Sequence, residues 1–458
     1  MNLDFRYALQ ALPLLLQGAL VTLETSLLAV VLGIAVGIAL TLLGQAPIRP
    51  VRWACQLYIS VMRGTPLFIQ ILMVYYVLPG VGLDIPRFVA GVVALSLNSG
   101  AYVTEILRGG LSMIPRGQVD AGRSVGMPRA LIWRHVLLPQ TIALVLPPLT
   151  VEFTSLLKAS ALLSVIAVIE LTRTAQQIIA ATFRPVELWL ATGALYFVMC
   201  SALGDREVAR APRRGPPRLT GRHAMRFDLS VIAETWPIFV RGLGFTILCC
   251  VLALVLGLIL GTIVALARLS HRGWLQWPAA VYVEVIRDTP FLVQAFLIYF
   301  LLPRYHIRLP ATTAGIIALA LYGAAAFAES IRGAVLSVAR GQAEAARAVG
   351  MSHLLTMRRI IRPQMMTYLI PSLTNQFIGL VKESSVLSII TVPELTMASS
   401  LVLGRTFAAV EAYSVVAALY WGLTLAISVG MGALERRMAG PLQSGRAWAP
   451  LLIEGRES

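Results

Sequence analysis

The chain has 458 residues, of which 57% are hydrophobic and only 13% are charged. Its mean hydropathy is +0.78, whereas a soluble domain of this size would carry far more charge. Apolar runs of about 20 residues, the length that crosses a bilayer, recur along the whole chain, for example at 22–43 and 246–266. This pattern predicts an all-α membrane protein in a lipid bilayer and excludes a closed β-barrel, whose segments are short and alternating.

The net charge of +16 comes almost entirely from arginines that lie between the apolar runs. A nucleic-acid-binding domain would gather such charge on a polar face with few apolar runs, so we expect no nucleic-acid partner. The placement instead agrees with the excess of basic residues in the cytoplasmic loops of membrane proteins.

An internal repeat runs through the chain at an offset of 224 residues. For example, Thr65-Pro66 pairs with Thr289-Pro290. Between 103–127 and 327–351, 11 of 25 positions are identical, far more than chance would produce. Such self-similarity at a fixed period indicates two copies of one structural unit.

We expect about five transmembrane helices in each copy. The predicted spans are 12–43, 55–79, 88–107, 137–166 and 186–203 in the first copy, and 237–267, 279–303, 312–331, 361–390 and 410–432 in the second. The predicted domains are a first unit at 1–204, a basic linker rich in Pro, Gly and Arg at 205–225, a second unit at 226–440 and a tail at 441–458.

Both copies place their arginines in the same loops, above all between the third and fourth spans. In the first copy this loop holds Arg108, Arg116, Arg123, Arg129 and Arg134. In the second copy it holds Arg332, Arg340, Arg347, Arg358, Arg359 and Arg362. By the positive-inside bias these loops are cytoplasmic, so each copy begins outside and ends inside.

We call these segments loop A (117–139) and loop B (341–363). Loop B has good helix formers with an acid near their start, where the helix dipole favours it. Gly350 suits the end of that helix, and Pro363 opens the next span. The pattern predicts a short helix, a turn, a second short helix and then a span. A connector that merely covers the membrane surface would not need this segment twice at one offset.

Loop B resembles the signature loop of the binding-protein-dependent ABC importer permeases: Glu-Ala-Ala, three residues, Gly, and a proline about a dozen residues on. The resemblance implies that both loops contact an ATPase. The implied residues are Gly341, Glu344, Ala345, Ala346, Arg347, Gly350 and Pro363 in loop B, and Gly117, Asp120, Ala121, Arg123, Gly126 and Pro139 in loop A. Loop A departs from the pattern, because Gly122 replaces the second alanine and should soften its helix by roughly 1 kcal/mol.

Other segments resemble the polar amino-acid subfamily of these permeases, such as 63–66 with Ile69-Gln70, and 393–395. The resemblance covers about 18–196 and 242–420 and implies a fold like that of type I ABC importers. It also implies a dimeric ATPase, a periplasmic or tethered solute-binding protein, alternating access, a small polar solute and a bacterial inner membrane. ATP and Mg²⁺ would bind the ATPase, and we expect no cofactor in this chain.

Several polar residues are candidates for the translocation path or its gating: Arg63, Thr65, Glu105, Lys158, Arg287, Thr289, Glu329 and Lys382. Two alternatives stay open for them. The arginines could be anchors that reach the cytoplasmic interface. The lysines, the only two in the chain, could form packing salt bridges with Glu152 or Glu383, or could act in gating or in attracting a substrate carboxylate.

The sequence contains no phosphate-binding Gly-x-x-x-x-Gly-Lys-Ser/Thr loop, and its five histidines lack metal-ligand spacing. We therefore expect a conduit and not an enzyme. The main alternative is an ion-coupled secondary transporter with five plus five spans, whose repeats are inverted across the membrane. Inverted repeats would place the basic loops of the two copies on opposite sides, which the arginines disfavour. A membrane scaffold would explain the duplication but not the paired loops.

The linker presents a difficulty, because five spans leave the first copy ending inside while the second should begin outside. Residues 204–228 hold no apolar run and carry seven arginines, which makes a membrane crossing costly. Met225 resembles a fresh start of a protein. Our hypothesis is that two adjacent permease genes were joined here, by fusion or by a frame error, and N-terminal sequencing of the expressed product would decide.

Overall fold

A computed structural model describes residues 4–79, 82–204 and 229–438, and these residues form helices joined by short loops, with no strand among them. The first half consists of α1 (Arg6–Leu43), α2 (Arg49–Gly64), α3 (Leu67–Val77), α4 (Arg87–Ser112), α5 (Arg116–Ser124), α6 (Arg129–Ile132), the π-helix η2 (Trp133–Leu137), α7 (Leu138–Ala159), the 3₁₀ helix η3 (Ser160–Ile166), α8 (Leu171–Thr182) and α9 (Pro185–Gly204).

The second half repeats this order. It consists of α10 (Leu229–Leu269), α11 (Gly273–Asp288), α12 (Phe291–Leu301), the 3₁₀ helix η4 (Leu302–Tyr305), α13 (Ala311–Leu336), α14 (Arg340–Ala348), α15 (His353–Thr356), the π-helix η5 (Met357–Ile361), α16 (Arg362–Glu383), the 3₁₀ helix η6 (Ser384–Ile390), α17 (Leu395–Thr406) and α18 (Ala409–Met438). The all-α fold and the two units predicted from the sequence are confirmed.

The first helix of each half packs closely along the long helix that follows the Thr-Pro break, α1 on α4 and α10 on α13. Small residues allow this approach. A Cβ added at Gly37 would lie 2.5 Å from the side chain of Val103, and one added at Gly261 would lie 2.9 Å from the side chain of Phe327. Close contact of this kind replaces hydrophobic burial as the force that joins helices in lipid.

The second expected span of each half is broken at its Thr-Pro pair. In the first half, α2 and α3 meet at an angle of 109°. Proline cannot donate the next helical hydrogen bond. The side chain of Gln70 instead stabilises the bend between α2 and α3. Its Nε2 donates to Thr65 Oγ1 (2.7 Å) and to the Met62 carbonyl (2.9 Å). Gln294 makes the same bonds to Thr289 and Ile286, at 2.8 Å each.

The ten expected spans thus correspond, in the described residues, to seven helices long and apolar enough to cross a membrane. The number rises to nine if each of two strongly bent helix pairs counts as one span. The expected span at 279–303 is divided between α11 and the short apolar helix α12. The protein is therefore a multi-pass membrane protein whose second spans are broken and not straight.

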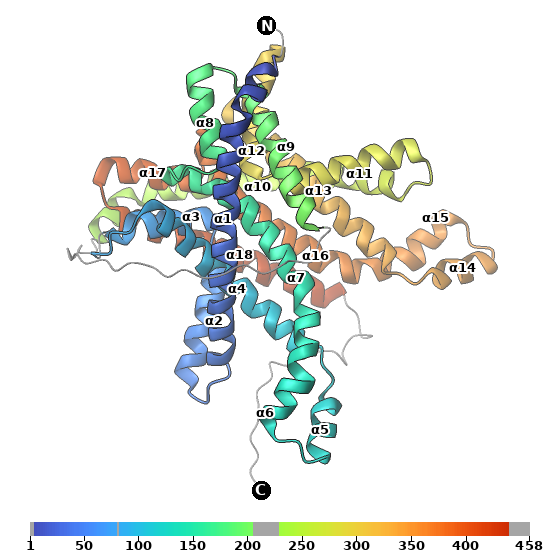
Figure 1. Ribbon diagram of the computed structural model, residues 1–458. Coiled ribbons are helices and arrows are strands. Elements are labelled where there is room, and N and C mark those ends of the chain that lie inside the picture. Colours follow the sequence, from blue (N-terminus) through green and yellow to red (C-terminus); the bar gives the residue numbers. More distant parts are fainter. Residues whose placement is uncertain (1–3, 80–81, 205–228, 439–458) are drawn as a thin grey trace.

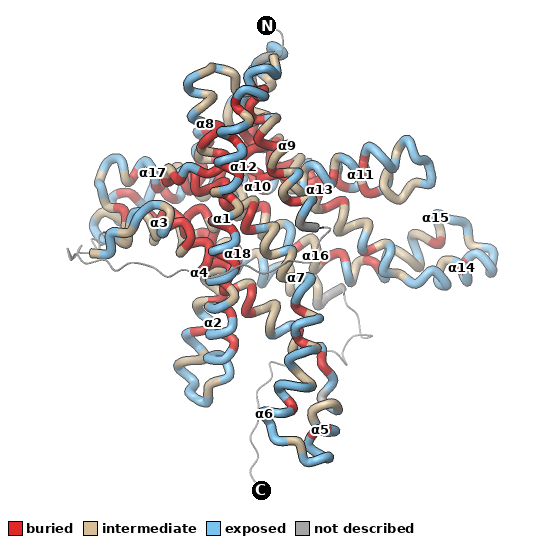
Figure 2. Tube along the Cα trace, viewed as in Figure 1, coloured by how far each residue is buried: buried red, intermediate tan, exposed pale blue. Residues whose placement is uncertain are grey.

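The two halves cross near the centre of the molecule. In Figure 1 the loop A helices α5 and α6 project from the bottom and the loop B helices α14 and α15 from the right, while α8 and α17 lie at the top and the left. These positions fit a pseudo-two-fold axis from upper left to lower right, which places both loops at one end. Figure 2 shows buried residues concentrated around the crossing, whereas the loops are mostly exposed.

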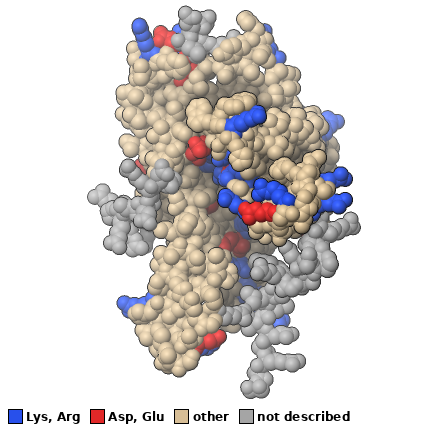
Figure 3. Space-filling model, turned by 90° about the vertical axis from the view of Figure 1, so that its right-hand side faces the viewer, with Lys and Arg blue, Asp and Glu red and all other residues tan. Residues whose placement is uncertain are grey.

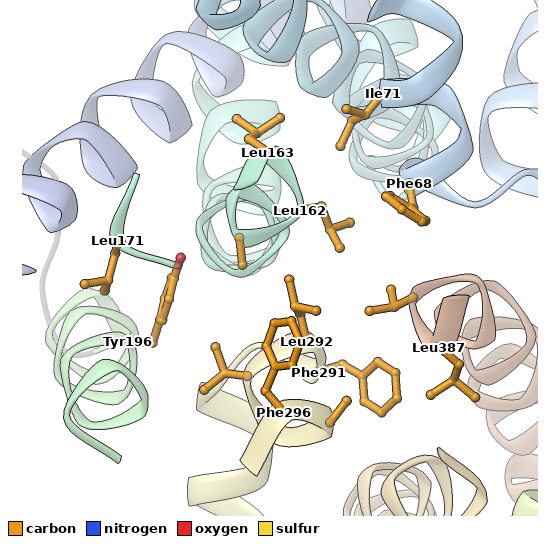
Figure 4. Packing of buried hydrophobic residues seen from close by; sticks show 14 of the residues in the cluster. Phe68, Ile71, Leu162, Leu163, Leu171, Tyr196, Phe291, Leu292, Phe296 and Leu387 are labelled. Atoms are coloured by element: carbon orange, nitrogen blue, oxygen red, sulfur yellow. The ribbon is translucent and has the colours of Figure 1, made fainter. Parts of the chain in front are cut away.

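Each half lends one element to the other, because α3 packs against α18 and α12 packs against α9. Figure 4 shows how the cores merge there. Phe68 and Leu162 of the first half face Phe291, Leu292 and Leu387 of the second, and all five are at most 9% exposed. The halves therefore share one continuous apolar core and do not fold as separate bodies.

One pair of helices was not predicted, α8 and α17. Each begins at a fully buried glutamate that caps it. Glu170 accepts hydrogen bonds from the backbone N–H groups of Thr172 and Arg173, at 2.8 Å each, and from Tyr196 Oη at 2.8 Å. Such caps satisfy the free donors of a helix start, and Glu394 does the same in the second half.

The linker lies outside the described residues, which end at 204 and resume at 229. The hypothesis of two joined genes and the crossing of the linker therefore stay predictions.

Candidate functional site: paired loops and a central cavity

Loops A and B form the predicted helix, turn and short helix. Gly126 and Gly350 adopt positive φ angles of 76° and 79°. In loop B the N–H groups of Gly350 and Met351 donate to the carbonyls of Arg347 and Ala346, both at 3.0 Å. This is a Schellman motif, in which glycine adopts the left-handed conformation without steric cost. The glycine turn predicted from the sequence is confirmed in both loops.

After the turn, each loop enters the next span through a single π-helical turn, η2 or η5. Pro139 and Pro363 follow directly, at the start of α7 and α16. A π-turn shifts the register of a helix locally and occurs often at functional sites. The loops are thus joined to their spans by the same irregular element in both halves.

Gly122 has a packing reason that its helix propensity does not reveal. A Cβ added there would lie 3.0 Å from Ile132 Cγ1, and Ile132 is only 2% exposed. The equivalent pair in loop B is Ala346 and Thr356, at 2% and 3% exposed. Loop A pairs the smaller Gly122 with the larger Ile132, whereas loop B pairs the larger Ala346 with the smaller Thr356. The space between the two short helices is therefore filled in both loops.

The outer surface of the loops is exposed and partly charged. Asp120 forms an ion pair with Arg123 at 3.6 Å, whereas Glu344 is exposed and has no ion pair within 4 Å among the described residues. The equivalent tips Val125 and Val349 are 76% and 77% exposed. Figure 3 shows Lys and Arg side chains gathered on the face from which α14 and α15 project. Both loops thus present an exposed and partly charged surface.

A cavity of about 290 Å³ lies between the two halves, and we call it the central cavity. Its apolar wall includes Phe68, Leu162, Phe291 and Leu292, the layer seen in Figure 4. Its polar lining comes from both halves and consists of Thr65, Asn98, Tyr102, Glu152, Ser155, Lys158, Thr289, Tyr322, Lys382, Glu383 and Ser385. The cavity thus brings together four of the eight candidate path residues.

The two lysines reach across the pseudo-two-fold axis. Lys158 Nζ donates to the Arg287 carbonyl at 2.7 Å. Lys382 Nζ donates to the Arg63 carbonyl at 3.2 Å and to Tyr102 Oη at 2.9 Å. The salt bridges with Glu152 or Glu383 that the sequence left open do not occur within 4 Å in the described residues. Each lysine instead holds the broken span of the other half.

The remaining path candidates, Arg63, Glu105, Arg287 and Glu329, lie outside the central cavity, and only Arg63 and Glu105 pair with each other. Arg63 contacts Glu105 at 3.4 Å and lies over the ring of Tyr102. Glu329 pairs with Arg268 and, at 2.9 Å, with Arg332. These carboxylates hold arginines on the side of the cavity nearer the loops. Arg287 contributes its backbone carbonyl to Lys158.

A second cavity of about 460 Å³ adjoins the central one at Lys158 and Ser155. Its other polar lining residues are Thr154, Cys200, Ser201, Glu284, Arg287 and Asp288. The sequence did not predict this cavity. It also did not predict the roles of Asn98, Tyr322, Glu170 or Gln70, because these roles depend on contacts between separate helices, such as those of Asn98 with Gln70 and of Tyr196 with Glu170.

No group of three or more His, Cys, Asp or Glu side chains that could hold a metal ion occurs in the part of the chain that the structure describes. The polar chemistry of the site is therefore that of ammonium groups, carboxylates, hydroxyls and amides.

Comparison with known proteins assigns the repeat. The family described as binding-protein-dependent transport system inner membrane component matches twice, at residues 29–206 and 233–440. The chain belongs to this family. Each match covers one half of the duplication, so this chain consists of two permease units in tandem.

Similar proteins include permeases of about half the length of this chain from Bacillus subtilis. The arginine transport system permease protein ArtQ is 39% identical over 43% of this chain and 91% of its own length. The probable glutamine ABC transporter permease protein GlnM is 38% identical over 46% and 98%. The L-cystine transport system permease protein TcyB is 38% identical over 42% and 82%. These relatives, each named for the transport of an amino acid, thus match a stretch of this chain about as long as one of its two units.

A solved structure described as an amino acid ABC transporter with histidines is 38% identical over 46% of this chain and 100% of the other, with a TM-score of 0.45. A structure of the MetNI methionine ABC transporter is 19% identical over 45% and 98%, with a TM-score of 0.41.

Proposed function

We propose that this chain is the membrane-spanning part of an ATP-driven importer of polar amino acids or closely related small solutes. A separate dimeric ATPase binds ATP and Mg²⁺ and docks on loops A and B. A periplasmic or tethered solute-binding protein delivers the solute at the opposite end, in the inner membrane of a bacterium. The chain itself performs no catalysis.

One observation carries this proposal: two equivalent helix-turn loops project from the same end of the molecule on either side of a polar cavity. A rigid short helix can lie in a groove of another protein and act as a lever. Because each loop continues directly into a span that lines the cavity, movement of the loops would reach the lysines. Alternating access requires this kind of connection.

The apolar layer between the halves supports the direction of closure. Phe68 and Leu292 line the cavity, and the helices that carry them, α3 and α12, lie in Figure 1 toward the end that carries α8 and α17. An apolar layer that closes the cavity on the side away from the loops is what the proposal requires of an importer waiting for its solute-binding protein.

Reconstitution in proteoliposomes with an ABC ATPase and a solute-binding protein of the same system tests the proposal. Glu344→Lys should abolish ATP-dependent uptake while the purified chain keeps its thermal stability, because it reverses a charge on the exposed face of α14. Gly350→Asp should do the same, since an L-residue at a φ of 79° is strained.

The matched control is Arg49→Glu, a reversal of charge at an exposed residue that starts α2 and lies in neither loop. It should leave uptake unchanged. Normal uptake by Glu344→Lys would contradict the docking role of loop B. Uptake that needs a sodium gradient and no ATPase would instead identify the chain as an ion-coupled secondary transporter.

A further inference from the structure

Building on the proposed function, we propose that the central cavity holds a single zwitterionic, net-neutral amino acid per chain, in one orientation between the two halves. The argument begins with the charges of the cavity. Its lining includes two ammonium groups, Lys158 and Lys382, and two carboxylates, Glu152 and Glu383. No other charged residue lines it in the part of the chain that the structure describes, so the formal charges of the lining sum to zero.

Net neutrality selects the charge of the ligand. In a site removed from bulk water a net charge is costly unless a partner compensates it. A cationic or an anionic solute would leave the filled cavity with an uncompensated charge. A zwitterion brings one ammonium and one carboxylate, and each meets the opposite charge on the wall.

The four charged groups are available to a ligand. No ion pair shorter than 4 Å joins any of them among the residues that the structure describes. The lysines are oriented by backbone carbonyls, one hydrogen bond to Arg287 and one to Arg63. An ammonium has three donors, so each lysine keeps at least one N–H for a carboxylate.

The two halves contribute different residues to the cavity, so the cavity offers one binding site and not two equivalent ones. The repeat places Gln376 opposite Glu152, and Ala159 opposite Glu383. Each half therefore supplies one carboxylate, but at a different position. A pseudo-two-fold rotation moves each carboxylate onto an uncharged residue, so the rotated pose of a ligand lacks its ammonium partner.

The neighbouring polar groups indicate a polar, uncharged side chain. Asn98 lines the cavity from the first half, whereas its repeat equivalent is Tyr322. Both carry groups that donate and accept hydrogen bonds, and Ser385 adds a hydroxyl. The volume of about 290 Å³ is at the lower end of ligand pockets, which suits one small solute.

Isothermal titration calorimetry on the purified full chain in detergent tests this inference, with L-glutamine, L-arginine and L-glutamate as probes. We expect L-glutamine to bind at one site per chain and more tightly than either charged probe. Glu152→Gln and Glu383→Ala, which install the residues of the opposite half, should each weaken L-glutamine binding by roughly 10- to 100-fold. Both variants should reduce the preference for L-glutamine over L-glutamate, because each leaves the lining of the cavity with a net positive charge.

The matched control is Glu284→Gln, which removes a carboxylate that lines only the second cavity and should leave the affinity unchanged. Tighter binding of L-arginine, two sites per chain, no binding of any probe at millimolar concentration, or unchanged binding by both cavity variants would each overturn the inference. ATP-dependent uptake that prefers L-arginine would leave the proposed function intact. If L-glutamine binds at one site but the chain shows no ATP-dependent uptake, the proposed function is contradicted and the inference about the cavity is supported.

Discussion

The two halves meet through two seams that are equivalent in the repeat but unlike in their packing. At the closed seam, between α18 and the α2–α3 break, Trp421 Nε1 donates to Ser60 Oγ at 3.2 Å and Thr424 Oγ1 donates to the Gly64 carbonyl at 2.8 Å. At the open seam, between α9 and the α11–α12 break, the second cavity occupies the corresponding space. Ser201 Oγ donates there to Asp288 Oδ2 at 3.3 Å.

Side-chain size accounts for the difference. The closed seam has the large Trp421 against Gly64, where an added Cβ would lie 2.5 Å from Trp421 Cδ1. The open seam has Phe197 and Asp288 at the equivalent positions. The same backbone thus provides a tightly packed contact on one side and a polar cavity on the other. This comparison teaches that duplication preserved the helices while the interface between the copies diverged.

Exchanging the seam residues should produce the largest effect. Gly64→Asp places a side chain against Trp421 and should destabilise the chain by about 1–3 kcal/mol, as overpacking does. Asp288→Gly removes only the bond to Ser201 at the open seam and should cost about 1 kcal/mol. Thermal unfolding of the two purified variants measures both. Equal losses would show that the seams do not differ in packing.

The loops allow a second exchange of residues between the halves. Gly122→Ala alone should destabilise loop A by about 1 kcal/mol, because the gain in helix propensity does not offset the contact with Ile132. Combined with Ile132→Thr it reproduces the pair of loop B and should recover that loss. A double-mutant cycle on thermal stability gives the coupling. Strictly additive effects would mean that the two residues do not pack as a unit.

The broken spans provide the smallest test. Gln70 Oε1 accepts a hydrogen bond from Asn98 Nδ2 at 2.9 Å, whereas Gln294 Oε1 is buried without a partner among the described residues. Gln70→Leu should therefore destabilise the chain by about 1 kcal/mol more than Gln294→Leu, because it also removes the shorter of the two hydrogen bonds that Asn98 Nδ2 donates, and leaves the one to the Met62 carbonyl at 3.2 Å. Denaturation of the two variants side by side measures the difference. A larger loss for Gln294→Leu would contradict the hydrogen-bond assignment.

Local and repeated features were predictable from the sequence. The spans follow from long apolar runs, and the orientation of the loops from arginine placement. The glycine turns at Gly126 and Gly350 follow from the conformation that only glycine adopts without cost. The duplication itself made weak signals usable, because each pattern occurs twice at one offset. These are properties of short segments, or of their repetition, and need no knowledge of distant contacts.

The tertiary structure alone decided which residues meet. Lys158 and Lys382 were recognised as unusual, but their partners are backbone carbonyls more than a hundred residues away, and a carbonyl carries no mark in the sequence. The contact of Glu170 with Tyr196 and the compensation between Gly122 and Ile132 depend on packing between separate helices. The sequence by itself thus determined the two units, most of their long helices and the position of the two loops at one end. Only the packing of one half against the other decided that their charges line one shared cavity and that one seam is closed while the other is open.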